Sequence, residues 1–161
     1  MNVELLDKIL KKRLPGDTAR PVLGAMNFGK RTPEAESKAI LRRALELGIV
    51  HIDTANAYGE GISETIVGEA LRGQRDKVTI ATKCGFGRIA GKPEGLSRAR
   101  IREAIDASLS RLGTDWVDVY YLHVPDHETP IDETLDGVAE LLEQKKILGW
   151  GVSNYAAWQV L

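Results

Sequence analysis

Short apolar stretches rich in β-branched residues alternate along this chain with longer segments in which apolar residues recur every three or four positions. The first pattern is typical of buried strands and the second of amphipathic helices. Five strands are predicted in this way, at residues 22–26, 49–53, 78–82, 117–122 and 147–152. Because a helical segment separates each strand from the next, we expect the strands to lie parallel in an α/β fold.

The helical pattern covers residues 3–13, 33–47, 63–72, 97–112 and 130–146. Thr32 and Pro33 form a typical helix start, with the threonine oxygen as the N-cap, and Gly48 is a typical helix end. Thr129 and Asp132 have the spacing of a capping box at the start of the last helix. The segment 3–13 is expected to pack on the core, with docking on a membrane or a partner as the weaker alternative.

The number of strands leaves two architectures open. A doubly wound sheet is complete with about five strands, whereas a (β/α)8 barrel takes about 250 residues. The length of 161 residues favours the doubly wound sheet. The residues of the candidate site must decide between the two.

Polar side chains follow the carboxyl ends of four predicted strands. In parallel α/β folds, active and ligand-binding sites lie at these ends. A single Asp, Lys or His at such a place has an ordinary structural explanation, but here that explanation must hold repeatedly. Several polar residues on one rim therefore predict a site. Its members are Asp53 and Tyr58 after the second strand, Lys83 after the third, His123 after the fourth, and Ser153 with Asn154 after the fifth.

These residue types also make chemical sense as one unit. A tyrosine hydroxyl gives up its proton in water only near pH ~10, and a neighbouring ammonium favours the charged phenolate. Lys83 would supply that ammonium to Tyr58, and Asp53 would hold the lysine in place. His123 would donate a hydrogen bond to the carbonyl oxygen that Tyr58 protonates.

Three other motifs point to different chemistry. Gly85 and Gly87 fit a loose dinucleotide fingerprint, but Pro93 separates them from the next helix, so the segment is interpreted as a loop. His123 and His127 are four residues apart, but Pro125 breaks a helix between them and no third ligand joins them, so no metal site is expected. Cys84 is expected to be a small buried residue, with a reactive thiol as the alternative.

The charge and the cysteine content narrow the possible partners. The 22 basic and 23 acidic residues leave a net charge of -1, which gives no electrostatic footprint for nucleic acid or an anionic membrane. The single cysteine fits a reducing compartment. The first residues contain charges and no long apolar run, so neither a signal peptide nor a membrane span is expected. We therefore expect a cytoplasmic protein with a small-molecule ligand.

Four segments together resemble the aldo-keto reductase family. Residues 51–59 read His-Ile-Asp-Thr-Ala-Asn-Ala-Tyr-Gly and resemble that family's Asp-Thr-Ala-x-x-Tyr-Gly signature. Residues 80–83 resemble its lysine strand, 120–123 its histidine strand, and 149–154 its Gly-x-Ser-Asn segment. The segments 121–135 and 153–158 look most similar to the branch of aflatoxin-aldehyde and succinic-semialdehyde reductases and their bacterial relatives.

The resemblance implies an NADPH-dependent reductase of aldehydes and ketones on a (β/α)8 TIM barrel. It implies that Tyr58 is the proton donor, that Lys83 and Asp53 tune it, and that His123 orients the substrate carbonyl. Ser153 and Asn154 match the pair that holds the nicotinamide carboxamide, and Asp53 also contacts the cofactor.

The chain is shorter than the family's barrel, with only about five βα units. Residues 1–161 are therefore expected to be the N-terminal portion of a single barrel domain, without the loops that bind the NADPH phosphates. Exposed sheet edges would then favour self-association or a separate carboxy-terminal half. The alternatives are an inactive fragment and a binding or regulatory module like the potassium-channel β-subunits, whose lack of the histidine distinguishes them from this sequence.

Overall fold

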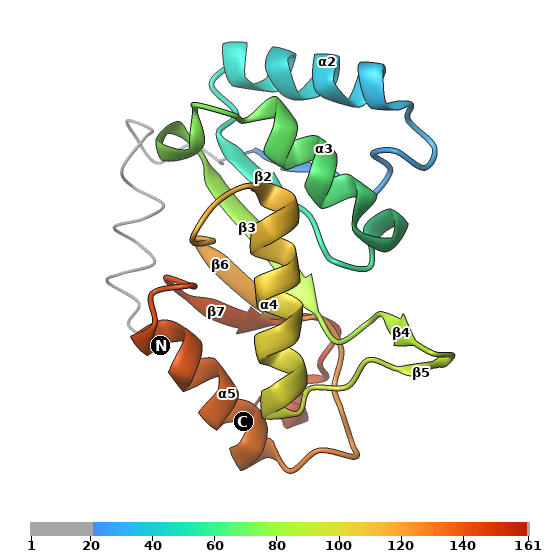
Figure 1. Cartoon of the computed structure of the whole chain (residues 1–161), viewed down its shortest axis with the longest axis vertical. Helices are drawn as coiled ribbons and strands as arrows, with labels where there is room; N and C mark the ends of the chain where they lie inside the picture. The colour runs from blue at the N-terminus through green and yellow to red at the C-terminus, as the bar shows by residue number, and fades with distance from the viewer. Residues whose placement is uncertain (1–20, 161) are drawn as a thin grey trace.

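The computed structural model describes residues 21–160, and the helix predicted at 3–13 lies outside them. The centre of the fold is a parallel sheet of five strands in the order β1-β2-β3-β6-β7 (Figure 1). All five predicted strands are confirmed, four with shortened bounds and β3 shifted towards its carboxyl end. They are β1 Val22–Gly24, β2 His51–Asp53, β3 Thr79–Cys84, β6 Val119–Leu122 and β7 Trp150–Val152.

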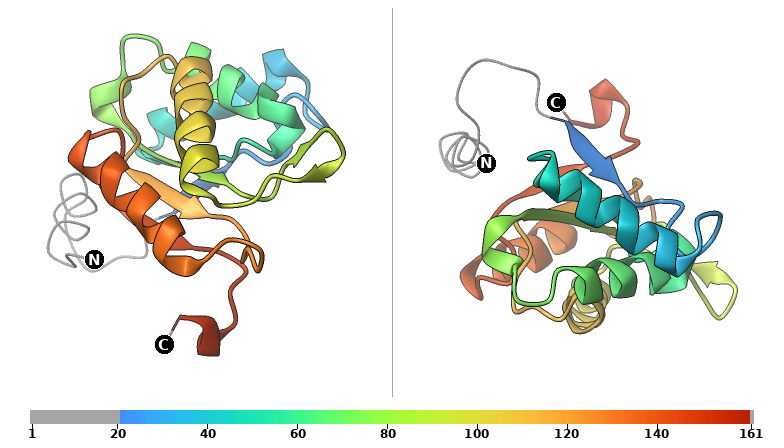
Figure 2. Two further views of the ribbon diagram at one scale, coloured as in Figure 1. Left: turned by 60° about the horizontal axis from the view of Figure 1, so that its bottom comes forward. Right: turned by 90° about the horizontal axis from the view of Figure 1, so that it is seen from above.

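The helices that connect these strands cover one face of the sheet, and none of the α-helices within residues 21–160 lies on the other face, which is called the open face below (Figures 1 and 2). They are α2 Glu34–Glu46, α3 Ile62–Ala70, α4 Arg98–Leu112 and α5 Ile131–Glu143. A doubly wound sheet would reverse its strand order and carry helices on both faces. Neighbouring strands here follow one another in sequence, as they do in a (β/α)8 barrel. The sheet is therefore a barrel arc, and the architecture favoured by length alone is wrong.

The alternation of side chains along β3 separates the packed face from the open face. Ile80 and Cys84 belong to the hydrophobic core under the helices, and Thr82 donates a hydrogen bond to Glu64 of α3. Lys83 points the other way and contacts Asp53 of the neighbouring strand. Because side chains alternate along a strand, the chain can bury its core and still present a lysine to the open face.

Gly48 marks the end of its helix as expected, and Gly113 and Ser97 mark the two ends of α4. Gly48 follows α2 with φ 79°, and Gly113 ends α4 with φ 63°, both in the left-handed region that favours glycine. Ser97 is the N-cap of α4 and accepts a hydrogen bond from the amide of Arg100.

The two threonine caps predicted from the sequence are wrong. Pro33 is the N-cap of α2, and no side chain caps that helix; Thr32 instead accepts a hydrogen bond on its carbonyl oxygen from Ser37 Oγ. Pro130 is the N-cap of α5, and the Thr129 hydroxyl donates to Asp126 Oδ2 at 2.6 Å. In both cases a proline follows the threonine and occupies the N-cap position itself.

Arg75 joins the amino-terminal ends of β3 and β6. Its guanidinium donates to the carbonyl oxygens of Val78 and Trp116 at 3.1 and 3.0 Å and to Asp118 Oδ2 at 2.7 Å. The same Asp118 oxygen accepts the amide of Ile80 at 2.9 Å. These contacts satisfy a buried carboxylate at the end of the sheet that lies opposite the polar rim.

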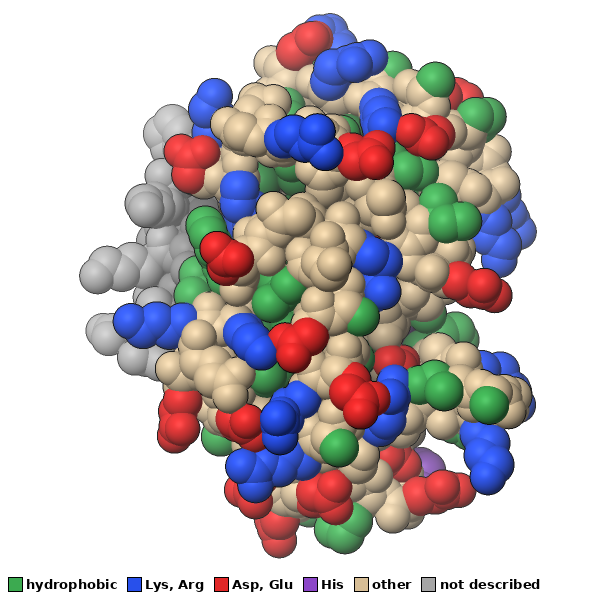
Figure 3. Space-filling view, in the orientation of Figure 1, with side chains coloured by type: hydrophobic (Ala, Val, Ile, Leu, Met, Phe, Trp, Pro, Cys, Tyr) green, Lys and Arg blue, Asp and Glu red, His purple; other side chains and the backbone are tan. Residues whose placement is uncertain are grey.

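The segment interpreted as a loop around Gly85 and Gly87 contains a small antiparallel hairpin, β4 Arg88–Ile89 with β5 Lys92–Pro93. It stands out from the body of the protein beside α4 (Figure 1). Acidic and basic side chains are interspersed over the face that carries α4, as the balanced net charge predicts (Figure 3). Within residues 21–160, none of the helices has the length and apolar character needed to cross a membrane.

Candidate active site

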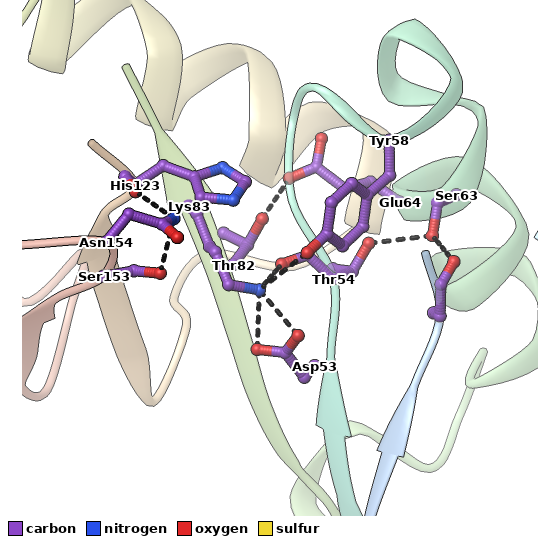
Figure 4. Close-up of polar contacts among 11 residues, drawn as sticks. Asp53, Thr54, Tyr58, Ser63, Glu64, Thr82, Lys83, His123, Ser153 and Asn154 are labelled. Carbon is purple, nitrogen blue, oxygen red and sulfur yellow. Dashed lines mark hydrogen bonds and ion pairs between the residues drawn. The ribbon is translucent and has the colours of Figure 1, made fainter. Parts of the chain in front are cut away.

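Lys83 and Asp53 meet at the carboxyl ends of neighbouring strands (Figure 4). Lys83 Nζ donates to Oδ1 and Oδ2 of Asp53 at 2.7 and 2.6 Å and to the carbonyl oxygen of Thr54 at 2.8 Å. The lysine side chain is 8% exposed and the aspartate side chain 30% exposed. A buried ammonium must be paired to stay charged, and Asp53 provides that pairing.

Tyr58 joins this pair from the turn that follows β2. Its hydroxyl lies 3.4 Å from Lys83 Nζ, which also lies 5.0 Å from the centre of the tyrosine ring. The turn is attached to β3, because the amide of Asn56 donates to the carbonyl oxygen of Lys83 at 3.1 Å. After Tyr58 the backbone passes through positive φ at Gly59, Glu60 and Gly61 before α3 begins. This tight reversal places the phenol over the strand ends.

His123 lies directly after β6, where its amide donates to the carbonyl oxygen of Cys84 at 2.8 Å. Its ring is 5.8 Å from the ring of Tyr58 in an edge-on arrangement and 5.1 Å from that of Phe86. Burial, followed by the nearby Lys83 charge, lowers the pKa of His123. The imidazole is therefore neutral at pH 7 and carries one ring proton.

The ring nitrogens of His123 differ in their surroundings. Among the described residues Nδ1 is buried without a hydrogen-bond partner. The tautomer that leaves this nitrogen unprotonated places the ring proton on Nε2 and avoids a buried, unpaired N–H group. His123 can then donate a hydrogen bond from Nε2.

Ser153 and Asn154 lie beyond the end of β7, close to His123. The amide of Ser153 donates to the carbonyl oxygen of Leu122 at 2.9 Å. Asn154 Nδ2 donates to the carbonyl oxygen of His123 at 2.8 Å and to Ser153 Oγ at 3.1 Å (Figure 4). These bonds leave the Ser153 hydroxyl proton and Asn154 Oδ1 available, a donor and an acceptor side by side. A carboxamide group has the complementary pair, an oxygen that accepts a hydrogen bond and a nitrogen that donates one.

The six predicted site residues thus lie on one rim, as the sequence indicated. Lys83, Asp53 and Tyr58 form one connected group, and His123 contacts it through the tyrosine ring. Ser153 and Asn154 are connected to the group through the backbone of His123.

Two residues that support this rim were not predicted from the sequence. Glu64 is fully buried on α3, accepts Thr82 Oγ1 at 2.5 Å and pairs with Arg111 of α4 at 2.7 Å, so it holds β3 in place next to Lys83. Tyr121 lies beside Lys83 on the open face, with the ammonium 6.0 Å from its ring centre.

Gly151 on the next strand makes room for the Tyr121 ring. A Cβ atom at that glycine would lie 2.8 Å from Tyr121 Cε1. A glycine inside a predicted strand was the one sequence signal for this close approach.

The competing motifs have ordinary structural surroundings. Cys84 is buried in the core, and this burial raises the pKa of its thiol to about 12, which removes the reactive-thiol alternative. Gly85 and Gly87 precede the β4–β5 hairpin and do not open a helix. Among residues 21–160, no three His, Cys, Asp or Glu side chains come together as a metal site would require.

The described strands form an arc of a (β/α)8 barrel with Asp, Tyr, Lys and His side chains at its carboxyl rim, the end where barrel enzymes carry their active sites. The comparisons with known proteins agree. The Aldo/keto reductase family matches residues 22–161, so the chain belongs to the aldo-keto reductase family. The resemblance seen in the sequence is confirmed.

Individual relatives show how much of a longer protein the match covers. Aflatoxin B1 aldehyde reductase member 4 of Homo sapiens is 44% identical over 147 residues, which cover 88% of this chain and 43% of that protein. A probable voltage-gated potassium channel subunit beta of Oryza sativa is 35% identical over 138 residues, 84% of this chain and 42% of that protein. The holo form of aldo-keto reductase AKR11C1 from Bacillus halodurans superposes with a TM-score of 0.79 at 39% identity, over 88% of this chain and 48% of that one. The chain thus spans less than half the length of each.

Proposed function

We propose that this chain carries the proton-donating half of an NADPH-dependent carbonyl reductase, which reduces aldehydes or ketones to alcohols. The observation that supports this proposal most directly is the position of Lys83 Nζ, 2.6 Å from Asp53 Oδ2 and 3.4 Å from the Tyr58 hydroxyl. Oxidoreductase relatives in the same family support the same reaction class.

Tyr58 is the proton donor in this mechanism. When the phenol gives its proton to the carbonyl oxygen of the substrate, negative charge develops on the phenol oxygen, and the ammonium of Lys83 stabilises that charge. Asp53 keeps the lysine in position and compensates its charge when no substrate is present. His123 donates from Nε2 to the same carbonyl oxygen and sets the orientation of the substrate.

The residues at the ends of β2 and β7 fit NADPH. The Ser153 hydroxyl can donate to the carboxamide oxygen of the nicotinamide, and Asn154 Oδ1 can accept from its amide nitrogen. Asp53 is partly exposed and its oxygens have lone pairs left beyond the lysine contact, so it can accept from a cofactor hydroxyl. When bound, NADPH supplies the hydride.

The described strands form part of one barrel domain, and we propose that further strands complete it. β1 and β7 each have a neighbour on one side only within the part of the chain that the structure describes. Such edges bind other strands, either further segments of a longer protein or a second copy. We also propose a cytoplasmic location and a small carbonyl compound as substrate, without nucleic-acid or membrane partners.

A regulatory module on the same fold is the second candidate, because one relative carries the name of a potassium-channel β-subunit. The presence of His123 beside Tyr58 favours the reductase. An inactive fragment remains the third candidate for these 161 residues by themselves.

The test uses two proteins: the 161-residue chain, and a completed barrel in which these residues are continued by the carboxy-terminal strands of the Bacillus halodurans relative. The completed barrel is expected to oxidise NADPH and form the alcohol from an aromatic aldehyde in equal amounts. A folded completed barrel that binds NADPH without turnover would overturn the reductase proposal in favour of the regulatory module.

The 161-residue chain by itself is expected to bind NADPH weakly and without turnover. Binding must offset ~4–15 kcal/mol of lost translational and rotational freedom, and the residues proposed here contact only the nicotinamide end. Fluorescence of Trp116, Trp150 and Trp158 during a titration with NADPH measures this affinity. Saturation at micromolar NADPH together with aldehyde reduction would show that the five-stranded arc is sufficient.

A further inference from the structure

Glu94 lies outside the rim, yet its buried carboxylate joins the two loops that carry Tyr58 and Phe86. Its side chain is reached from three sides: Glu94 Oε1 accepts Asn56 Nδ2 at 2.7 Å, and Oε2 accepts the amides of Gly85 and Gly87 at 2.7 and 3.1 Å. The residue is 7% exposed. Hydrogen bonds to an ionised, buried acceptor are among the stronger ones in proteins, so this carboxylate is well placed to fix both loops.

In each loop, a residue that bonds to this carboxylate lies within two sequence positions of a residue at the site. Asn56 precedes Tyr58 by two positions, and its own amide is bonded to the carbonyl oxygen of Lys83. Phe86 lies between the two glycines whose amides Glu94 accepts, and its ring contacts His123 at 5.1 Å. Movement of the first loop would shift Tyr58 relative to His123, and movement of the second would shift Phe86, which packs against the His123 ring.

The two glycines are adapted to this contact. A Cβ atom at Gly87 would lie 3.0 Å from Glu94 Oε2, and Gly85 has a φ of 98°, where a Cβ would also lie 2.6 Å from the side chain of Leu96. Gly87 therefore lies directly against the carboxylate, and a side chain at either position would force the loop to move, at Gly85 because of its positive φ and the contact with Leu96.

We propose that Glu94 and Asn56 form a clamp that positions Tyr58 against His123, and that the clamp sets the rate of carbonyl reduction without contacting substrate or cofactor. This role in the reaction rests on the proposed function, whereas the clamp itself rests only on the contacts above. Glu94 is thus a positioning residue.

The hydrogen-bond donor and acceptor of the contact between Asn56 and Glu94 can be exchanged by substitution. Asn56→Asp places a second carboxylate against Glu94 and breaks the contact, whereas Glu94→Gln leaves only one acceptor oxygen and puts an amide nitrogen near Asn56 Nδ2. In the double variant Glu94→Gln with Asn56→Asp, the glutamine nitrogen can donate to the new aspartate while its oxygen still accepts the glycine amides. Glu103→Gln is the matched control, because Glu103 lines a pocket of about 530 Å³ together with Asn56 and Glu94 but bonds to Arg100 and to neither loop.

The first measurement is amide hydrogen exchange of Gly85 and Gly87 in the 161-residue chain, which needs no enzymatic activity. Loss of the clamp in Asn56→Asp is expected to speed exchange by ~10-fold or more, and the double variant is expected to return to within about threefold of the parent chain. Glu103→Gln is expected to exchange like the parent. If Asn56→Asp does not fold, a folded double variant supports the clamp and an unfolded double variant overturns it.

The second measurement is kinetic and uses the completed barrel. Because a small misplacement of a reacting group is costly, Asn56→Asp is expected to lower kcat by ~10-fold or more while KM for NADPH changes less than about twofold. The double variant is expected to recover most of kcat.

Single and double variants with equal losses of kcat would overturn the positioning role. Unchanged amide exchange of Gly85 and Gly87 in Asn56→Asp would overturn the clamp. A parent barrel without turnover contradicts only the proposed function, since the exchange measurement still tests the clamp.

Discussion

The ammonium of Lys83 contacts both carboxylate oxygens of Asp53, at 2.7 and 2.6 Å, from the adjacent parallel strand. Asp53 is opposite Ala81 in the strand register, so the lysine two residues further on points to the same face and reaches back to it. The lysine is the more deeply buried partner, with 8% of its side chain exposed against 30% for the aspartate.

This asymmetry predicts unequal losses of stability. Asp53→Ala leaves a buried ammonium without its counter-charge and is expected to lower the free energy of unfolding by on the order of 3 kcal/mol. Lys83→Met is expected to cost less, because Asp53 can turn to water. Urea unfolding of both variants and the double variant measures the difference. A larger loss for Lys83→Met would show that the cost of leaving the buried ammonium unpaired does not determine the loss of stability.

Tyr58→Phe is expected to reduce turnover of an aldehyde by the completed barrel by ~100-fold or more, because the variant has no proton to donate. Affinity for NADPH should stay close to that of the parent, since the hydroxyl contacts Lys83 and no residue proposed to bind the cofactor. Tyr121→Phe serves as the control for removing a nearby hydroxyl. Retained turnover in Tyr58→Phe would mean that another group or water supplies the proton.

The lowered pKa of His123 makes stability depend on pH. The unfolded chain takes up a proton on this residue near pH ~6.5, whereas the folded chain takes it up only at lower pH. Between these values the unfolded state binds more protons, so the free energy of unfolding falls as the pH falls through this window. The contribution of His123 is complete above pH ~6.5. His123→Asn should remove this part of the pH dependence in urea unfolding measured at several pH values.

Lys83 is one cause of that lowered pKa, after burial. Lys83→Met is therefore expected to raise the pKa of His123, since the remaining charges of Asp53 and Glu94 favour the protonated ring. An NMR titration of the histidine ring protons in parent and variant measures the change. A pKa that stays the same or falls in the variant would show that the lysine charge does not reach the imidazole.

Cys84 is expected to resist alkylation in the folded chain. The thiol is buried, and its pKa of about 12 leaves almost no thiolate at neutral pH. The chain has one cysteine, so mass spectrometry after treatment with iodoacetamide reads this residue directly. Rapid modification without denaturant would contradict the buried position, and modification in urea serves as the positive control.

The sheet edges should be the least protected part of the sheet. Val22–Gly24 and Trp150–Val152 each pair on one side only within the described residues, whereas β3 pairs on both sides. Amide exchange is therefore expected to be faster in β1 and β7 than in β3. Protection that rises with protein concentration would show that a second copy covers the edges.

The sequence by itself determined the strands of the sheet and which polar residues lie together on its carboxyl rim. Strand and helix patterns are local, because each reflects which side chains of one segment face a core, and they predicted every strand of the sheet. The site residues could be predicted because parallel strands place their carboxyl ends on one rim, whatever the order of the strands. Local signals failed where two compete, as at Thr32 and Thr129, where the following proline became the N-cap.

The local pattern of strands and helices left the order of the strands open, the family resemblance implied the barrel, and only the tertiary structure decided the contacts between distant segments. Length favoured a doubly wound sheet, whereas the resemblance implied a (β/α)8 barrel of about five βα units; the helices pack on one face and the strands follow one another in an arc, which confirms the barrel. The contact of Asn56 with Glu94 joins residues 38 positions apart, and that of Glu64 with Arg111 residues 47 apart. A buried carboxylate has to find partners once the chain is compact, and which partners lie within reach depends on packing rather than on spacing in the sequence.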